Sequence, residues 1–433
     1  MLKKEKPYLL IKIIYLALSG AMFYFTQGAI EAGGFGFMYR YLFGMGIIAM
    51  GFFSFLVHPN MERAKKLFHG FLIVSAAYIV TVLWSTVIWI STFAEFRTMT
   101  RGFFFPFYQI LSAATAVSTL YMFGKKGIWY CLGGMCIGNS VIILQTVAGG
   151  GLGTFIEELV TLLTTFGEQT GALMHEVEVH DLTFAFGSFA VFLMLDPHLK
   201  KKGWWAAFLA TMLFMVVGLK RIEVGAVILA VIVCWPLKYM QSKTAKKIAF
   251  VFSFVIILCT FAYIIAIHAG LFDYLEAHGM DTKGRNGLYR YLNTQYSISP
   301  SFMGRGLGFS NTAWDLSGVE WIGIKQDAYH NEFLRMYIEV GFVGYVVWFL
   351  MYLPVRLGYV WKHGGQLAGV LTLAYSIYCM ITYATDNTLY YFYTNLSMFI
   401  LILYELMGEE ENGTDKISAP ESRSKKQRAV SKR

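Results

Sequence analysis

Three glycine-rich and charged motifs lie within one stretch of the chain, between residues 284 and 348. Residues 284–290 read GRNGLYR, residues 304–308 read GRGLG, and residues 330–344 read HNEFLRMYIEVGFVG. The last motif passes from polar residues into an apolar run that continues to Trp348. Polar, glycine-rich sequence therefore meets a hydrophobic helix here, whereas most of the remaining chain is predicted to lie in membrane spans.

The composition indicates a membrane protein. The chain has 433 residues, of which 56% are hydrophobic and 15% are charged, whereas soluble domains carry about 25% charged residues. Apolar runs of about 20 residues recur, which is long enough to cross a bilayer core of roughly 30 Å. The 5 cysteines lie within apolar runs and show no zinc or disulfide spacing. We therefore expect no metal and no cofactor.

Hydropathy predicts an all-α polytopic protein with about twelve membrane-spanning helices. An even number of spans places both termini on the same side of the membrane. The predicted spans are residues 8–27, 36–57, 68–92, 103–123, 127–147, 181–195, 203–219, 222–237, 248–268, 330–353, 366–385 and 388–407.

The positive charge is distributed as in a protein of the cytoplasmic membrane. Lysine and arginine cluster at the N-terminus, in alternate short loops and after residue 407, and are scarcer in the other loops. By the positive-inside rule, both termini are cytoplasmic. The net charge of +9 therefore indicates topology and contact with membrane lipids, not nucleic-acid binding. Residues 1–407 form the predicted transmembrane domain, and residues 408–433 a disordered, basic cytoplasmic tail.

The opposite, outer face carries two long connections. The first covers residues 148–180, and the second is a large extracytoplasmic loop at residues 269–329, before the tenth span. Short loops suffice to join helices. Two long loops on one face therefore predict a cap or a functional site outside the membrane.

His330 and Asn331 begin the tenth span on this outer side. A histidine there can act as a general base near neutral pH, with Asn331 as a positioning group. Arg335 and Glu339 follow within the span at the i,i+4 spacing. Ionisable residues inside a span are costly and usually paired, so a structural ion pair is the simpler interpretation of Arg335 and Glu339.

Lys220 and Arg221 lie between two short spans on the face where basic residues are scarce. An anionic substrate group would offset this unfavourable placement, because arginine binds phosphate oxygens through a planar fork and lysine adds a point charge. The alternatives are pairing with Glu223 or with lipid phosphates.

Three further arginines lie in the large outer loop. Arg285 and Arg290 fall in a predicted short amphipathic helix whose apolar side would carry Leu288, Tyr291 and Leu292. That helix could aim Arg285 into a cavity, or could rest at the interface with solvated arginines. Arg305 lies between glycines in a flexible turn, which is no nucleotide-binding fingerprint because no strand–helix context exists.

Residues 175–181, HEVEVHD, contain two histidines and three acidic residues. A strand would place His175 and His180 on opposite sides, and a helix would bring His175 close to Val179. No familiar metal motif has this spacing, so we favour an acidic loop that orients a polar acceptor over a metal site.

The order of these motifs resembles the O-antigen ligase and polymerase (WaaL/Wzy) superfamily. The resemblance rests on Arg221 between short spans, Gly284-Arg285 followed by Leu288, the glycines of residues 304–308, and the HNEFL and EVGFVG motifs. It covers roughly residues 180–350. In the family a small hydroxyl residue often precedes the arginine and a small residue follows it, whereas here Lys220 and Ile222 flank Arg221.

The resemblance implies glycan transfer from undecaprenyl diphosphate to a sugar hydroxyl on the outer face of the membrane. It implies that His330 acts as the base and that Arg221 and Arg285 stabilise the departing diphosphate. The implied substrate contacts are Lys220, Arg290, Arg305, Asn331 and Glu339. The implied partners are a lipid-linked oligosaccharide, a chain-length regulator and a flippase.

Three functions remain open from the sequence. The first is a polymerase of lipid-linked polysaccharide repeat units, and the second is a ligase that moves finished glycan to another acceptor. The third is a transporter of lipid-linked oligosaccharide, which predicts a polar pathway through the midplane and often repeated halves. Because the charges cluster at one face and no internal repeat is evident, we favour an enzyme, and the polymerase first.

Overall fold

The computed structural model describes residues 6–26, 35–177, 180–196, 203–282, 285–310 and 330–408. Every regular element in these ranges is helical. Residues 311–329 of the predicted outer loop and residues 409–433 of the predicted tail lie outside the described part. The predicted all-α class is therefore confirmed for the residues that the structure describes.

The first group of helices is built largely from long apolar segments. Small residues bring two of them close together, because a Cβ on Gly134 would lie 2.3 Å from Ser19 Oγ and one on Gly138 2.7 Å from Phe23 Cβ. Helices α1 and α6 pack together along these residues. The elements are α1 (Lys6–Tyr24), η1 (Phe35–Met38), α3 (Tyr39–Val57), α4 (Met61–Thr92), α5 (Phe96–Phe123), η2 (Gly124–Lys126) and α6 (Gly127–Gly150).

The second group contains shorter helices and one long one. Its elements are α7 (Leu152–Thr164), α8 (Ala172–Val177), α9 (His180–Leu195), α10 (Trp204–Gly218), α11 (Arg221–Cys234), η4 (Pro236–Lys238) and α12 (Ser242–His268). Helix α9 is apolar on every side and buried along nearly its whole length, as expected for a helix at the centre of a bundle. It packs against α10, α11 and α18.

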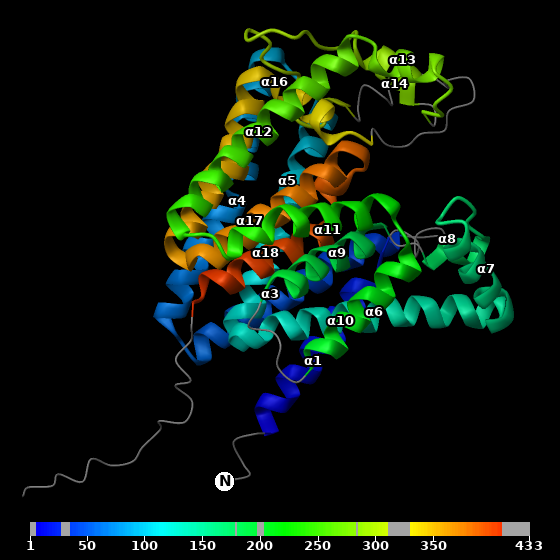
Figure 1. Ribbon diagram of the computed structural model, residues 1–433. Helices are drawn as coiled ribbons and strands as arrows, with labels where there is room; N and C mark the ends of the chain where they lie inside the picture. Colours follow the sequence, from blue (N-terminus) through cyan, green and yellow to red (C-terminus); the bar gives the residue numbers. More distant parts are fainter. Residues whose placement is uncertain are drawn as a thin grey trace, which may run out of the picture.

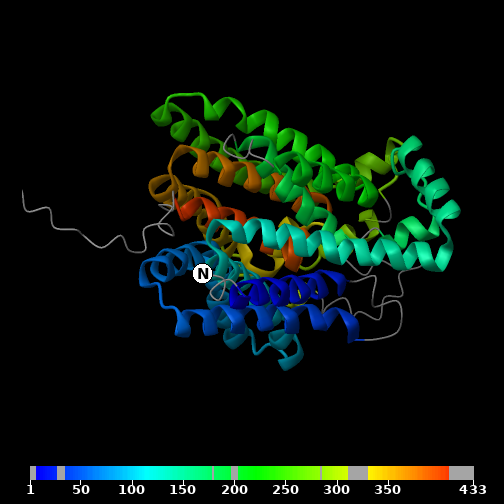
Figure 2. The ribbon, with the colours of Figure 1, turned by 90° about the horizontal axis from the view of Figure 1, so that it is seen from below.

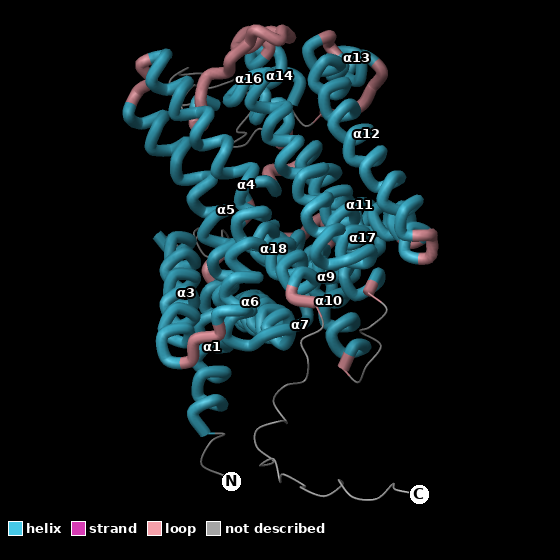
Figure 3. The backbone as a smooth tube through the Cα atoms, turned by 90° about the vertical axis from the view of Figure 1, so that its left-hand side faces the viewer, coloured by secondary structure: helices cyan, strands magenta, loops and turns pink. Residues whose placement is uncertain are grey.

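The third group supplies the outer helices and the middle of the bundle. Its elements are α13 (Leu271–Ala277), α14 (Arg285–Leu292), α16 (Glu332–Leu350), the π-helix η5 (Met351–Val355), α17 (Arg356–Thr385), η6 (Thr388–Tyr390) and α18 (Phe392–Leu406). Helices α17 and α18 run between the α1–α3 side and the α10–α12 side (Figure 2). Helices α13 and α14 lie beside the upper end of α12, at the end of the molecule far from the start of the chain (Figures 1 and 3).

Within the described part of the chain, five helices are long and apolar enough to cross a membrane by length and composition. They are Tyr39–Val57, Met61–Thr92, Phe96–Gly150, Ser242–His268 and Glu332–Thr385. Shorter apolar helices are Leu9–Tyr24, Asp181–Leu195, Trp204–Gly218 and Phe392–Leu406. The chain is thus built as a helical membrane protein, and a helix overlaps each of the predicted spans.

Two predicted connections differ from the structure. Residues 148–180 are largely helical, because α6 continues to Gly150 and α7 and α8 follow. The carboxylate of Glu158 accepts hydrogen bonds from the backbone N–H groups of Leu173 (2.8 Å) and Met174 (3.0 Å), which docks α8 onto α7. Residues 354–365 are also helical rather than a loop, since η5 and α17 continue α16 up to a break at Gly365.

Candidate functional site

Helix α14 places Arg285 at its first residue and faces the bundle with apolar side chains. Leu288, Tyr289 and Leu292 are buried, and Tyr289 packs edge-on against Phe272 with ring centroids 4.6 Å apart. The predicted helix is confirmed, but its buried aromatic residue is Tyr289, whereas Tyr291 is half-buried.

The guanidinium group of Arg285 forms hydrogen bonds to the described residues with only some of its N–H groups. Its Nη2 donates to the carbonyl oxygen of Thr385 (3.2 Å), at the end of α17. Its Nε is buried and has no hydrogen-bond partner among the described residues. A buried N–H of a guanidinium without an acceptor is costly. The side chain therefore retains donor capacity that an anionic group could use.

Arg290, on the same helix, is engaged elsewhere. It forms an ion pair with Asp273 of α13, in which Nε and Oδ1 are 2.7 Å apart, and its side chain remains exposed. Glu276 of α13 accepts hydrogen bonds from Thr282 and from Asn286. Hydrogen bonds from Arg290 and Asn286 lower the pKa of Asp273, and those from Thr282 and Asn286 lower the pKa of Glu276. These contacts join α13 to α14.

His330 precedes α16 in an uncommon backbone conformation. Its φ is +48°, in the left-handed region, and its N–H donates to Asn387 Oδ1 (3.0 Å). Asn331 is fully buried and caps α16, because its Oδ1 accepts from the N–H of Leu334 (3.1 Å). His330 is half-buried, so its ring lies at the edge of the packed region while Asn331 has a structural contact.

Arg285 and His330 both form hydrogen bonds to the short connection between α17 and η6. Arg285 binds the carbonyl of Thr385, and the N–H of His330 binds the side chain of Asn387, two residues later. Asp386 Oδ1 accepts from the N–H of Asn387 (2.7 Å) and from the hydroxyl of Tyr391 (2.8 Å), which fixes the connection. A candidate base and a candidate diphosphate-binding cation therefore converge on residues 385–387.

The glycine-rich motif docks backbone to backbone against a break in α16. Gly341 has φ +66°, and a Cβ there would lie 2.2 Å from the carbonyl carbon of Met303. The break frees carbonyl groups, and the N–H groups of Arg305 and Gly306 donate to Ile338 (2.9 Å) and Glu339 (2.7 Å). Trp84 of α4 donates through Nε1 to the next carbonyl, that of Val340 (2.8 Å).

The side chains of this region have defined partners. Arg305 Nε donates to the carbonyl of Gln295 (3.2 Å), and its side chain is exposed. Arg335 pairs with Glu339, with Nε and Oε1 3.6 Å apart, as the i,i+4 spacing indicates. Glu339 is fully buried, and its Oε1 also accepts from the N–H groups of Gly308 (3.1 Å) and Ser310 (3.2 Å).

Lys220 and Arg221 lie at the start of α11. Arg221 is exposed, and its Nε would lie 3.9 Å from a Cβ on Gly167, at the turn that follows α7. Lys220 is half-buried and acts electrostatically on Glu223, one of the alternatives that the sequence left open. In the part of the chain that the structure describes, no hydrogen bond or ion pair joins Arg221 to residues 385–387.

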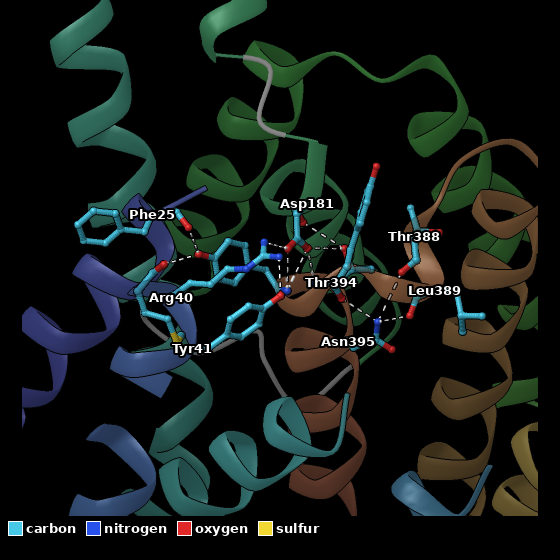
Figure 4. Close-up of polar contacts among 11 residues, drawn as sticks. Phe25, Arg40, Tyr41, Asp181, Thr388, Leu389, Thr394 and Asn395 are labelled. Carbon is cyan, nitrogen blue, oxygen red and sulfur yellow. Dashed lines mark hydrogen bonds and ion pairs between the residues drawn. The ribbon is translucent and has the colours of Figure 1, made fainter. Parts of the chain in front are cut away.

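The structure contains a second polar network that the sequence analysis did not predict. Asp181 of α9 pairs with Arg40 of α3 (Oδ2 to Nη1, 3.3 Å) and accepts from the N–H groups of Tyr393 (2.9 Å) and Thr394 (3.0 Å). Figure 4 shows Asp181 between Arg40 and the start of α18. Asp181 thus caps α18 and ties three helices together. The sequence does contain a signal for this network, because Arg40 and Asp181 have opposite charges and both lie inside predicted spans.

The 175–181 motif does not form one cluster around a metal. His175 is exposed in α8, Asp181 belongs to the network with Arg40, and the side chain of His180 is not described. Among the described residues, no group of three or more His, Cys, Asp or Glu side chains is arranged to hold a metal ion.

The fold and these contacts define an all-helical membrane protein with a polar site at one end of the bundle. Comparison with models of known protein families gives no match, and comparison with curated protein sequences gives none either. The function is therefore argued from the site itself.

Proposed function

We propose that the protein is a membrane glycosyltransferase that polymerises lipid-linked polysaccharide repeat units. The donor would be a glycan on undecaprenyl diphosphate, and the acceptor a sugar hydroxyl on the outer face of the cytoplasmic membrane. The observation that carries the proposal is the convergence of Arg285 and His330 on residues 385–387. The resemblance of the HNEFL and EVGFVG motifs to O-antigen ligases and polymerases supports the same chemistry.

The transfer needs one group that accepts a proton and one that stabilises negative charge. The acceptor oxygen would bond to the anomeric carbon while the bond from that carbon to the diphosphate oxygen breaks, which inverts the anomeric configuration. The hydroxyl proton would pass to a ring nitrogen of His330. The electron pair would leave with the diphosphate, whose charge the guanidinium of Arg285 would stabilise.

The proposed topology places this site outside the membrane. Twelve spans with cytoplasmic termini would put residues 269–329 and the start of α16 on the outer face. Figure 3 supports one part of this arrangement, because α13, α14 and the start of α16 lie at the end opposite α1. Lys220 and Arg221 would lie on the same face, where Arg221 would contact the donor as it approaches.

The test is glycan transfer by the purified protein in detergent. With synthetic undecaprenyl-diphosphate repeat units as the sole substrate, we expect a ladder of lengthening lipid-linked glycans. Transfer that needs an added second acceptor would identify a ligase instead. Absence of transfer under both conditions, together with movement of the lipid-linked sugar across liposomes, would overturn the enzyme and identify a transporter.

A further inference from the structure

Glu332, the first residue of α16, is a buried acid whose carboxyl group forms no hydrogen bond with the part of the chain that the structure describes. The residue has 0% exposure, and neither carboxyl oxygen has a hydrogen-bond partner among the described residues. A carboxylate ion that is removed from water is stabilised only if it is paired or hydrogen-bonded. Asn331 and Leu334, its neighbours in the first turn, bond to each other instead.

Burial is the main factor that opposes ionisation of Glu332, and the charges around it act in both directions, with Arg335 favouring the ionised form and the two acids opposing it. The charged groups that act most strongly on it are Arg335, Glu339 and Asp386, one cation and two acids. Tyr390 and Tyr391 also interact electrostatically with Glu332, but neither phenol supplies a positive charge. The guanidinium of Arg335 is paired with Glu339 and lies 4.1 Å from the ring centre of Tyr390.

Glu339 lies on the same helix but, unlike Glu332, has hydrogen-bond and ion-pair partners. It is equally buried, but its Oε1 accepts two backbone N–H groups and faces Arg335 at 3.6 Å. Hydrogen bonds to the charged form and a nearby cation both favour a carboxylate. The two acids, seven residues apart, thus have matched burial and contrasting partners.

We propose that Glu332 is a proton-binding site, a carboxylic acid that is neutral at neutral pH beside the candidate base His330. Glu339 is its ionised counterpart. The proton on Glu332 leaves Arg335 paired with Glu339, and Glu339 in turn holds Gly308 and Ser310. Ionised Glu332 would compete for Arg335 and weaken the attachment of residues 304–310. This inference does not depend on the proposed glycan transfer.

Infrared difference spectroscopy on the purified protein at neutral pH tests the proposal. Glu332→Gln should remove the carbonyl band of a protonated carboxylic acid from the spectrum, whereas Glu339→Gln should remove a carboxylate band. The spectrum of each variant is subtracted from that of the wild type, because other buried acids can also contribute bands. Glu223 is one such acid, and its oxygens lack hydrogen-bond partners among the described residues. Loss of a carboxylate band in Glu332→Gln would overturn the proposal.

Thermal unfolding of the same two variants gives an independent measurement. Glutamine is a neutral isostere of a protonated glutamate, so Glu332→Gln should unfold close to the wild-type temperature. Glu339→Gln should unfold at a lower temperature, because Arg335 would remain buried with its ion pair to Glu339 removed. The opposite ranking of the two variants would contradict a neutral Glu332.

Discussion

His330 and Asn331 are neighbours with different roles in the structure. The ring of His330 is at the edge of the packed region, whereas the side chain of Asn331 caps α16 from a fully buried position. The left-handed backbone at His330, with φ +48°, strains an alanine but is tolerated by asparagine. Replacing His330 with asparagine therefore removes the imidazole without adding backbone strain.

His330→Asn should lower the rate of glycan transfer by about 10²–10⁴-fold, the range for loss of a general base, with little change in unfolding temperature. Asn331→Ala should instead lower stability by about 1 kcal/mol through loss of the helix cap. Transfer assays and thermal unfolding on both variants distinguish these effects. Full transfer activity in His330→Asn would remove this residue from the proposed chemistry.

At the scale of elements, the break in α16 explains why the chain needs glycine at position 341. Gly341 and Gly365 have similar backbone conformations, with φ of +66° and +84°. They differ in surroundings, because a Cβ on Gly341 would meet the backbone of residues 302–304, whereas one on Gly365 meets nothing within 4 Å. Position 365 therefore serves as a control for backbone strain alone.

Gly365→Ala should cost about 1–3 kcal/mol, the usual cost of this backbone region in a residue other than glycine. Gly341→Ala should cost about 1–3 kcal/mol more, because the added methyl group also displaces the docked segment. Thermal unfolding in detergent measures both variants. Equal losses of stability would show that the contact with residues 302–304 is not important.

The α13–α14 pair depends on two exposed acids whose pKa values are lowered in the folded protein. A lowered folded pKa adds stability that is present above the unfolded pKa, about 4 for Asp and Glu, and is lost as pH falls through the folded value. Protonation of Asp273 and Glu276 should therefore loosen this pair below about pH 4.

Hydrogen exchange, corrected for its intrinsic pH dependence, should show weaker protection of residues 271–292 at pH 3 than at pH 7. Arg290→Ala should already show weaker protection at pH 7, because the ion pair with Asp273 is lost. Unchanged protection across this pH range would mean that apolar contacts such as Phe272 with Tyr289 hold the pair without the acids.

At the scale of the whole molecule, the sequence predicts helices well and contacts poorly. Long apolar runs predict where the apolar helices of the described chain lie, because a bilayer core requires segments of that kind. The site depends on contacts between distant segments, such as Arg285 with Thr385 and His330 with Asn387. Spacing along the chain carries no information about these pairs, and the predicted spans 366–385 and 388–407 leave only residues 386–387 as a connection.

The proposed topology makes a prediction about labelling from outside the cell. His278 lies exposed after α13, and Gln241 lies exposed before α12. A membrane-impermeant thiol reagent should label His278→Cys in intact cells, and should label Gln241→Cys only after the membrane is permeabilised. Wild-type protein controls for the native cysteines. The reverse labelling pattern would invert the topology and place the candidate site in the cytoplasm.

The most direct test of the account compares two arginines five residues apart on α14. Arg285 binds the end of α17 and keeps one N–H group that no described residue accepts, and Arg290 is exposed and paired with Asp273. In the transfer assay with undecaprenyl-diphosphate repeat units, Arg285→Ala should lower the rate at least about 10²-fold, as expected when a group that stabilises the developing charge is lost. Arg290→Ala should stay within a few-fold of wild type. Near wild-type transfer by Arg285→Ala would contradict the central claim that Arg285 and His330 form one catalytic site.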